Sequence, residues 1–202
     1  MSSSYSSPTQ PFSDSKVVET EIPLIEACLT EDGEILINET KFQDVLRSKG
    51  FGEREDANYV LKPYEALYLV HTKRLTFRNM AEVNFHLLFE ILLKYDPNIM
   101  TKFLVYRDLR SRGYVAKEGF GFGNDFRVYE RGEYEKKPAK YVVFGVNEGT
   151  NTSAKSFSNA IGQIEKMGKD AVVAVIERRG EVIYYKASNL HFIQNKYHQN
   201  NQ

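Results

Sequence analysis

Apolar residues recur every three to four positions between residues 81 and 95, as they do along one face of an amphipathic helix. This face holds Val83, Leu87, Leu88, Ile91 and Leu92, and predicts a helix. His86 lies on or beside the face. We expect it to be a packed structural histidine, because no cysteine or second histidine stands at metal-binding spacing. Further helices are expected at residues 38–48, 63–72, 98–112 and 153–167.

A different pattern follows residue 113. Short runs rich in β-branched and aromatic residues alternate with turns, which is typical of strands, and one expected helix interrupts them. In the first half of the chain, Glu31-Asp32-Gly33-Glu34 separates two apolar stretches and predicts a β-hairpin. The expected later strands are residues 115–117, 125–129, 141–146, 171–176 and 182–187.

These patterns divide the chain near Asp96. We predict an α/β (α+β) fold in which a mixed α+β domain at residues 18–95 precedes a compact domain at residues 96–191, with a mixed sheet and flanking helices. The first 17 residues are rich in Ser, Pro, Thr and Gln, and residues 192–202 are polar. Both ends are predicted to be flexible tails.

Charge and cysteine content narrow the classes of function. Lys plus Arg and Asp plus Glu both number 27, so any attraction to RNA must come from a local patch or a partner. The single cysteine, Cys28, excludes an internal disulfide and a multi-cysteine metal site. No segment approaches the ~18 consecutive apolar residues of a membrane span, and no secretory signal is evident. We expect a cytoplasmic protein without a cofactor.

A glycine-rich turn stands between two of the expected strands. Gly119, Gly121 and Gly123 lead into Asp125-Phe126-Arg127-Val128-Tyr129, after a basic helix that ends at Gly113. Glycines at every second position permit tight turns with positive φ. Their spacing is neither that of a dinucleotide-binding loop nor that of a Walker loop, so alone they are a weak phosphate signal.

As a whole, residues 106–129 closely resemble the C-terminal nuclease domain of tRNA-intron endonucleases. In that family a helix ending in a basic-Gly-Tyr turn precedes a Gly-Phe-x-Tyr-Gly-x-Asp-Phe-x-Val-Tyr segment. Three later segments are also similar to parts of this domain: the strand that follows its catalytic histidine, its lysine-bearing strand and its closing hairpin. They are residues 139–143, 169–176 and 179–185.

The resemblance implies that the catalytic machinery is incomplete. The family cleaves RNA without a metal, using the neighbouring 2′-hydroxyl as nucleophile and a Tyr, a His and a Lys. Position by position, the tyrosine corresponds to Phe122, the histidine to Pro138 and the lysine to Lys169. The four histidines are His71, His86, His191 and His198, so none lies between residues 87 and 190. We therefore expect a degenerate site that cannot transfer protons and does not cut RNA alone.

The resemblance also implies partners: a catalytic subunit of the same family, in a two-plus-two heterotetramer, and a precursor tRNA with bulge-helix-bulge sites. Two contact devices are expected. An acidic loop corresponds to Glu177, Arg178, Arg179, Gly180 and Glu181, although its two arginines depart from the acidic pattern. The second device is the C-terminal strand at residues 182–187, which would pair with a partner subunit through residues including Val182, Ile183 and Tyr185.

Three alternatives remain open. The chain would be an RNA-binding module if the basic residues around the end of one helix, near Tyr106 and Tyr114, touch phosphate. These basic residues are Arg107, Arg110, Arg112 and Lys117. It would be a metal-dependent nuclease if Asp125 and the run Glu135-Lys136-Lys137 held Mg²⁺. It would be a catalytic subunit if its active site were displaced.

Overall fold

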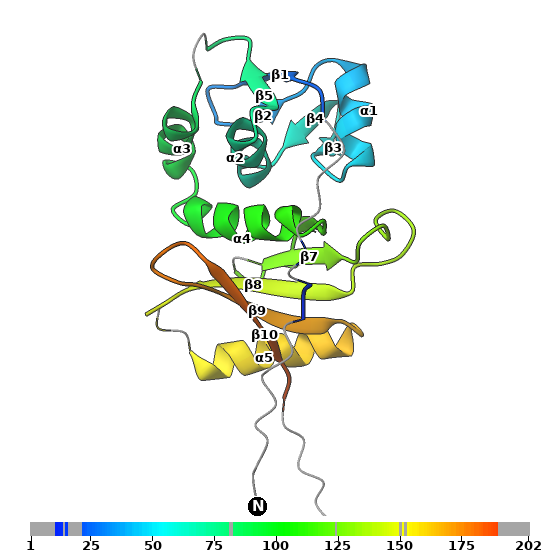
Figure 1. The fold of residues 1–202 in the computed structure, drawn as a ribbon, viewed down its shortest axis with the longest axis vertical. Helices are drawn as coiled ribbons and strands as arrows, with labels where there is room; N and C mark the ends of the chain where they lie inside the picture. The colour runs from blue at the N-terminus through cyan, green and yellow to red at the C-terminus, as the bar shows by residue number, and fades with distance from the viewer. Residues whose placement is uncertain are drawn as a thin grey trace, which may run out of the picture.

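The computed structural model describes residues 11–13, 15, 22–80, 83–123, 125–149, 151 and 153–189. Two five-stranded sheets follow one another along the long axis of the molecule, and helix α4 (Ile99–Ser111) lies between them (Figure 1). Both sheets are mixed and both are flanked by helices. The predicted mixed α/β fold is confirmed.

The N-terminal sheet has the strand order β3-β4-β2-β1-β5. The predicted hairpin joins β1 to β2, and in its turn the Thr30 amide donates to the Glu34 carbonyl at 2.9 Å. Strand β5 pairs in parallel with β1, after α2 has carried the chain across the sheet. The elements are β1 (Ile25–Leu29), β2 (Ile35–Leu36), α1 (Thr40–Ser48), β3 (Glu53–Glu55), β4 (Asn58–Leu61), α2 (Pro63–His71), β5 (Leu75–Phe77) and α3 (Phe85–Leu93).

The C-terminal sheet has the order β10-β9-β8-β7-β6 and is antiparallel except between β8 and β9, which α5 connects. Helix α4 covers one face of this sheet and α5 the other (Figure 1). Alternate residues of β9 therefore join two separate cores: Val172 packs on the α4 side, and Ala171 on the α5 side. The elements are β6 (Val115–Glu118), β7 (Asp125–Tyr129), β8 (Tyr141–Asn147), α5 (Ala154–Lys166), β9 (Asp170–Ile176) and β10 (Val182–Ala187).

The five predicted helices are all present, and local signals explain where they begin and end. Pro63 opens α2 at its first turn, where its missing N–H is not needed. Gly50 and Gly113 follow α1 and α4 with φ of 75° and 82°, the left-handed conformation that favours glycine after a helix. The prediction for His86 is wrong: its side chain is 81% exposed and lies 3.2 Å from Glu90. Only Leu88 and Leu92 of α3 are fully buried, so the helix turns a narrower face inward than expected.

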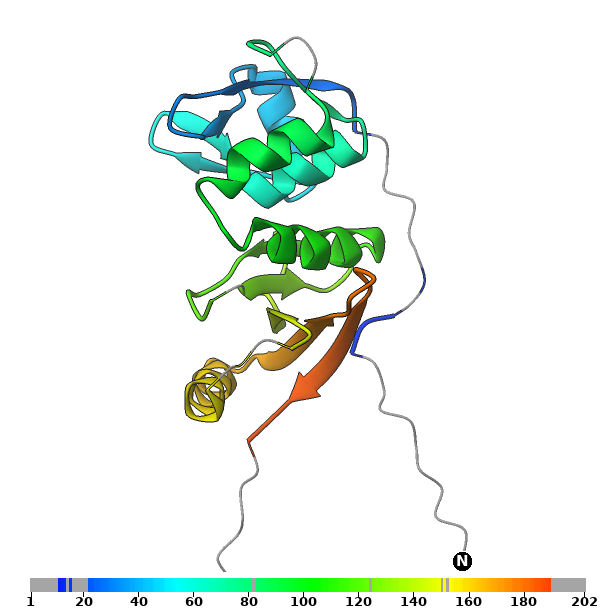
Figure 2. The same cartoon turned by 90° about the vertical axis from the view of Figure 1, so that its left-hand side faces the viewer.

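Residues 11–13 and 15 of the predicted N-terminal tail lie beside the C-terminal domain (Figure 2): Phe12 is buried there, whereas Ser13 and Ser15 are exposed but accept hydrogen bonds from Arg131. Phe12 is 1% exposed, and its ring contacts the rings of Tyr114, Tyr141 and Tyr184 at centroid distances of 4.7–5.1 Å. Arg131 donates to the Ser15 carbonyl at 3.0 Å. Phe12 thus belongs to the hydrophobic core of the C-terminal domain. Residues 1–10 and 192–202 of the predicted tails lie outside the described part of the chain, as do His191 and His198.

Candidate functional site

Two of the three positions that the resemblance assigns to catalysis meet at the start of β9. Lys169 directly precedes this strand, and its Nζ donates a hydrogen bond to the Ala139 carbonyl at 2.6 Å. The lysine therefore lies beside the segment that contains Pro138. Phe122 is half-buried in the core cluster beneath α5, with its ring centroid 6.2 Å from that of Phe144. Neither Phe122 nor Pro138 carries a group that can exchange a proton.

The glycine-rich turn is shaped by a buried carboxylate. Asp125 is buried, and its Oδ2 accepts a hydrogen bond from the Phe120 amide at 2.7 Å. A Cβ at Gly119 would lie 2.7 Å from the Asp125 carbonyl oxygen and closer still to its carboxylate. Gly119 is therefore required by close approach, whereas Gly121 and Gly123 adopt the expected positive φ, 88° and 120°. Burial raises the pKa of Asp125, against the opposing hydrogen bonds from backbone amides.

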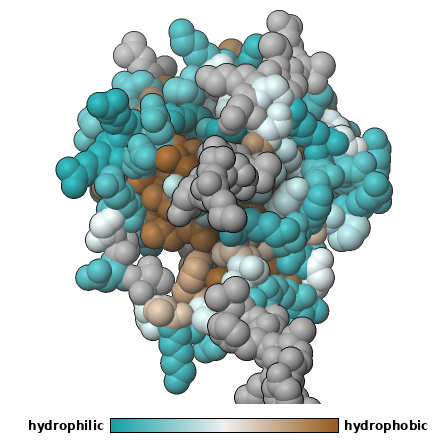
Figure 3. Space-filling model, turned by 60° about the horizontal axis from the view of Figure 1, so that its bottom comes forward, coloured by the Kyte–Doolittle hydropathy of each residue, from teal (hydrophilic) through white to brown (hydrophobic). Residues whose placement is uncertain are grey.

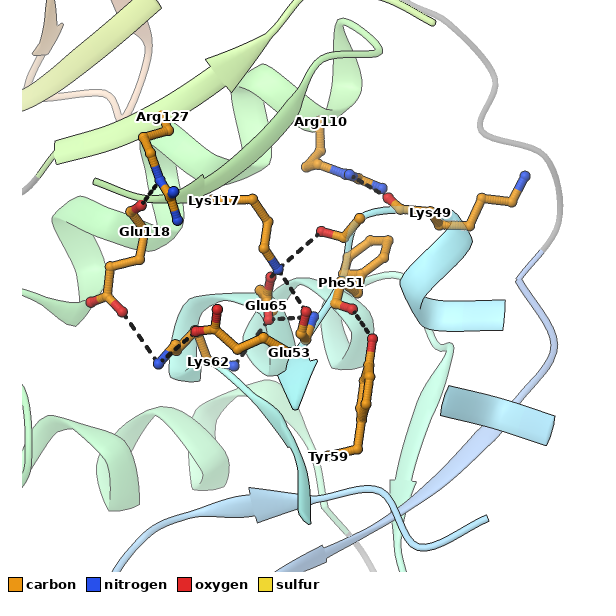
Figure 4. Close-up of polar contacts among 12 residues, drawn as sticks. Lys49, Phe51, Glu53, Tyr59, Lys62, Glu65, Arg110, Lys117, Glu118 and Arg127 are labelled. Atoms are coloured by element: carbon orange, nitrogen blue, oxygen red, sulfur yellow. Dashed lines mark hydrogen bonds and ion pairs between the residues drawn. The ribbon is translucent and has the colours of Figure 1, made fainter. Parts of the chain in front are cut away.

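Lys117, which the RNA-binding alternative includes among its phosphate-contacting residues, is buried between the two domains. This lysine is 7% exposed, and its Nζ reaches Glu65 at 3.2 Å and the Gly52 carbonyl at 2.8 Å (Figure 4). Glu65 is fully buried and also accepts from the Gly52 and Lys62 amides at 2.9 and 3.0 Å. The pair joins α2 of the N-terminal domain to β6 of the C-terminal domain. A buried charge is costly unless it is paired, and here Lys117 and Glu65 compensate each other across the two domains.

Arg110, from the same alternative, is also buried; it stacks on the Phe51 ring at 4.0 Å and donates to the Lys49 carbonyl at 2.9 Å. Arg112 is bound to Asp108 at 2.7 Å and stacks on Tyr184. Arg107 is partly exposed and donates to the Gly180 carbonyl at 3.2 Å. These arginines hold α4 to its neighbours. A contact of Arg107 or Arg112 with RNA stays a prediction.

The segment at residues 177–181 forms the expected hairpin turn between β9 and β10. The Glu177 amide donates to the Glu181 carbonyl at 3.0 Å, and Gly180 adopts φ of 77°. Arg178, Arg179 and Glu181 are exposed. The bond from Arg107 to Gly180 ties this turn to α4, so the hairpin presents its charged side chains from a fixed position. Its role in docking stays a prediction.

Strand β10 is at one end of the C-terminal sheet and pairs with β9 alone among the described strands. Ile183 stands opposite Val175, and Tyr185 opposite Val173. These four apolar residues are incompletely buried, and Tyr185 is 46% exposed. Figure 3 shows hydrophobic residues gathered on this end of the molecule and ringed by polar ones. An edge strand beside an apolar surface is suited to pairing with another chain.

The metal-dependent alternative gains no support from the donor set. Asp125 is buried with its carboxylate bonded to backbone, whereas Glu135 is exposed in the connection between β7 and β8. Within residues 22–80, 83–123, 125–149 and 153–189, no three His, Cys, Asp or Glu side chains form a group that could hold a metal ion.

A cleft between the two domains was not predicted. It has a volume of about 480 Å³. Arg54 and Tyr59 line it from the N-terminal domain; Arg127, Tyr129, Tyr134 and Glu135 line it from the C-terminal domain. An adjoining hollow shares Tyr129, Tyr134 and Glu135 and continues to Pro138. The two walls of the cleft are about 70 residues apart in sequence. Strand β3 has no alternation of apolar residues, so no local sequence pattern predicts the cleft.

Comparisons with known proteins agree with this architecture. Residues 99–184 match the tRNA intron endonuclease, catalytic C-terminal domain, and residues 26–89 match the N-terminal domain of the same enzymes. None of the helices that the structure describes is long and apolar enough to cross a membrane.

Curated relatives are similar over most of their length. A tRNA-splicing endonuclease of Methanococcus vannielii is 31% identical over 72% of this chain and 83% of its own length. One of Thermococcus onnurineus is 32% identical over 80% of this chain and 94% of its own. One of Pyrococcus abyssi is 26% identical over 84% and 98%. With both domains matched in order and the catalytic-domain turn in place, the chain belongs to the tRNA intron endonuclease family.

Proposed function

We infer that this chain is a non-catalytic structural subunit of a tRNA-splicing endonuclease, which assembles with a catalytic subunit in the cytoplasm and enables introns to be cut from precursor tRNA at bulge-helix-bulge sites. The relatives above carry the name tRNA-splicing endonuclease. The observation that supports a structural role is the chemistry at Phe122 and Pro138, because both positions lack a proton-transferring group.

Cleavage by a 2′-hydroxyl requires a base to remove its proton, an acid for the departing 5′-oxygen and positive charge beside the phosphorane. Of these, Lys169 supplies only charge, and its Nζ already donates to the Ala139 carbonyl. Phe122 keeps an aromatic ring packed near Phe144 without the phenolic oxygen. The site thus retains its packing without its chemistry.

The assembly role draws on β10 and its hairpin. An apolar edge strand gives a partner backbone hydrogen bonds and a surface to bury, and carboxylates on a fixed turn can set the register of docking. Two copies of this chain with two catalytic chains would satisfy both contacts.

The test uses three samples: this chain alone, a catalytic family member alone, and the two together, each with a precursor tRNA that contains a bulge-helix-bulge. We expect no cleavage by this chain alone, and a joint complex of two plus two chains by light scattering that cleaves the substrate. Cutting by this chain alone, after purification from contaminating nucleases, would refute the non-catalytic role. Failure to form a joint complex would refute the assembly role.

The docking hairpin is tested by the double substitution Glu177→Lys and Glu181→Lys. We expect weaker binding to the catalytic subunit and reduced cleavage by the mixture, because the resemblance implies that the acidic loop enters a basic cleft on the catalytic subunit, which two lysines would repel. The unfolding midpoint of the chain alone should stay within a few degrees of wild type. Glu90→Lys, at an exposed position of α3, is the matched control and should leave assembly unchanged. Unaltered binding by the double variant would argue against docking through this turn.

A further inference from the structure

The buried basic residues Arg110 of α4 and Lys117 of β6 cannot contact RNA freely, but the cleft between the domains carries other basic residues on an open surface. We propose that this cleft binds an unpaired strand of RNA, with phosphates at Arg54 and Arg127 and bases against its tyrosines. The inference rests on the proposed function only in that the ligand is RNA. It does not require the chain to be inactive or to have a partner.

Two of the arginines that line the cleft form no ion pair with any described residue. Asp44 is paired with Arg47 at 3.2 Å, and Glu53 with Lys62 at 2.9 Å. Lys62 is shared with Glu55 and Glu118, at 2.8 and 3.3 Å. Lys117 is paired with buried Glu65.

Once these pairs are set aside, Arg54 from β3 and Arg127 from β7 remain. Neither forms an ion pair within the described residues, and they share the cleft lining with the carboxylates of Asp44, Glu53 and Glu135. Arg127 donates from Nε to the Glu118 carbonyl at 2.7 Å, which orients the guanidinium and leaves its charge intact (Figure 4). Each wall of the cleft thus contributes one cation, suited to a phosphate chain lying between them.

Aromatic side chains supply the second element that single-stranded RNA requires. Tyr129 and Tyr134 line both hollows and contact each other edge to face, with centroids 5.1 Å apart. Tyr59 lines the opposite wall but is only 5% exposed, and its hydroxyl donates to the Phe51 carbonyl at 2.6 Å, so it supports this wall and leaves base stacking to Tyr129 and Tyr134. A groove that combines cations with aromatic rings is the usual device for binding unpaired bases without reading their sequence.

The shape of the surface favours a strand over a single small molecule. The main cleft of about 480 Å³ and the adjoining hollow of about 360 Å³ share three lining residues, so they form one continuous groove. Arg54 of the N-terminal domain lines the main cleft, and Lys136 and Pro138 line the adjoining hollow. The groove therefore leads toward the position that corresponds to the family's catalytic histidine. An acidic peptide would also meet Arg54 and Arg127, but it would meet Glu135 midway and make little use of the tyrosines.

The test measures binding of a fluorescent eight-nucleotide oligouridine to the full chain by anisotropy at several salt concentrations. Arg54→Ala and Arg127→Ala should each weaken binding and reduce the slope of log affinity against log salt by about 1, as expected for one lost phosphate contact. Tyr134→Leu should weaken binding about 5- to 100-fold with the slope unchanged, as expected for a lost stacking contact. Arg78→Ala is the control, since Arg78 is exposed and lies outside the cleft lining.

Circular dichroism melts of all four variants distinguish loss of binding from loss of fold. The proposal is overturned if folded wild-type chain does not bind the oligonucleotide, or if the three cleft variants bind as tightly as Arg78→Ala. It is also overturned if an oligoglutamate peptide binds more tightly than RNA and displaces it, which would make the cleft a protein-docking site. Each of these results can occur while the mixture with a catalytic subunit still cleaves precursor tRNA, so the proposed function is judged separately.

Discussion

Substitution of Lys117 by methionine tests whether the buried ion pair fixes the two domains to each other. Methionine keeps the approximate length of the lysine stem and removes the ammonium. Glu65 would then remain fully buried with only the Gly52 and Lys62 amides as donors. The Gly52 carbonyl would also lose its 2.8 Å hydrogen bond.

The magnitude follows from what stays behind. Removing one partner of a buried pair typically costs about 3–5 kcal/mol, because the other charge is left uncompensated. The two remaining amide donors to Glu65 place our expectation near the lower value, about 3 kcal/mol. At about 2–4 °C per kcal/mol for a chain of this size, the whole range corresponds to a fall in Tm of about 6–20 °C.

A double-mutant cycle isolates the interaction. Glu65→Gln keeps an acceptor for the backbone amides and removes the charge, so Lys117→Met with Glu65→Gln should be more stable than Lys117→Met alone. Urea unfolding of the four proteins gives the coupling energy. Arg78→Met, at an exposed pair with Glu26, serves as control and should change the midpoint little. A cost below about 1 kcal/mol for Lys117→Met, with no recovery in the double variant, would refute the reasoning.

Three further predictions concern packing and ionisation. Phe12→Ala should cost about 3–5 kcal/mol in urea unfolding, because its ring is buried among three tyrosines, whereas Leu24→Ala on the surface should cost little. Gly119→Ala should lower the Tm markedly, because its Cβ would overlap Asp125, whereas Gly162→Ala in α5 should change stability by no more than about 1 kcal/mol in either direction. Burial raises the pKa of Asp125 above 3.8, so the folded state binds this proton more tightly than the unfolded state does. The free energy of unfolding should therefore fall as pH rises from 3.8 to the raised pKa of the folded state. Asp125→Asn should flatten this part of the pH profile of unfolding.

The elements that sequence predicted well are those defined by local signals. Gly50 and Gly113 end helices through backbone conformations that other residues adopt at a cost, and Pro63 opens a helix for a reason contained in its own ring. In the C-terminal sheet, β8 and β9 are seven-residue strands made mostly of apolar residues, and β7 alternates polar and apolar residues over positions 125–128, so each carries a recognisable strand pattern. The family resemblance also depended on a local run of residues.

The features that sequence missed depend on partners far along the chain. Strand β3 reads Glu-Arg-Glu and is a strand only because β4 pairs with it. Lys117 looks like a surface lysine until α2 brings Glu65, 52 residues earlier, against it. Phe12 stands in a polar segment, and its pocket is made by tyrosines more than 100 residues away. In each case the deciding contact is tertiary and outweighs local propensity.

The same contrast bears on the proposed non-catalytic role, in which the fold would persist without catalysis. Proton transfer depends on single polar atoms at the ends of side chains, and Phe122 packs its ring near Phe144 without such an atom. The fold depends on buried volume and on paired charges. Examples are the buried ring of Phe12, the stacking of Arg110 on Phe51 and the Lys117–Glu65 pair, none of which involves Phe122 or Pro138. A subunit freed from catalysis in this way would still be required to keep its groove and its edge strand in fixed relation, because both are attached to the same helix-and-sheet frame. Variants of the Lys117–Glu65 pair should therefore change the free energy of unfolding and the binding to the catalytic subunit in parallel.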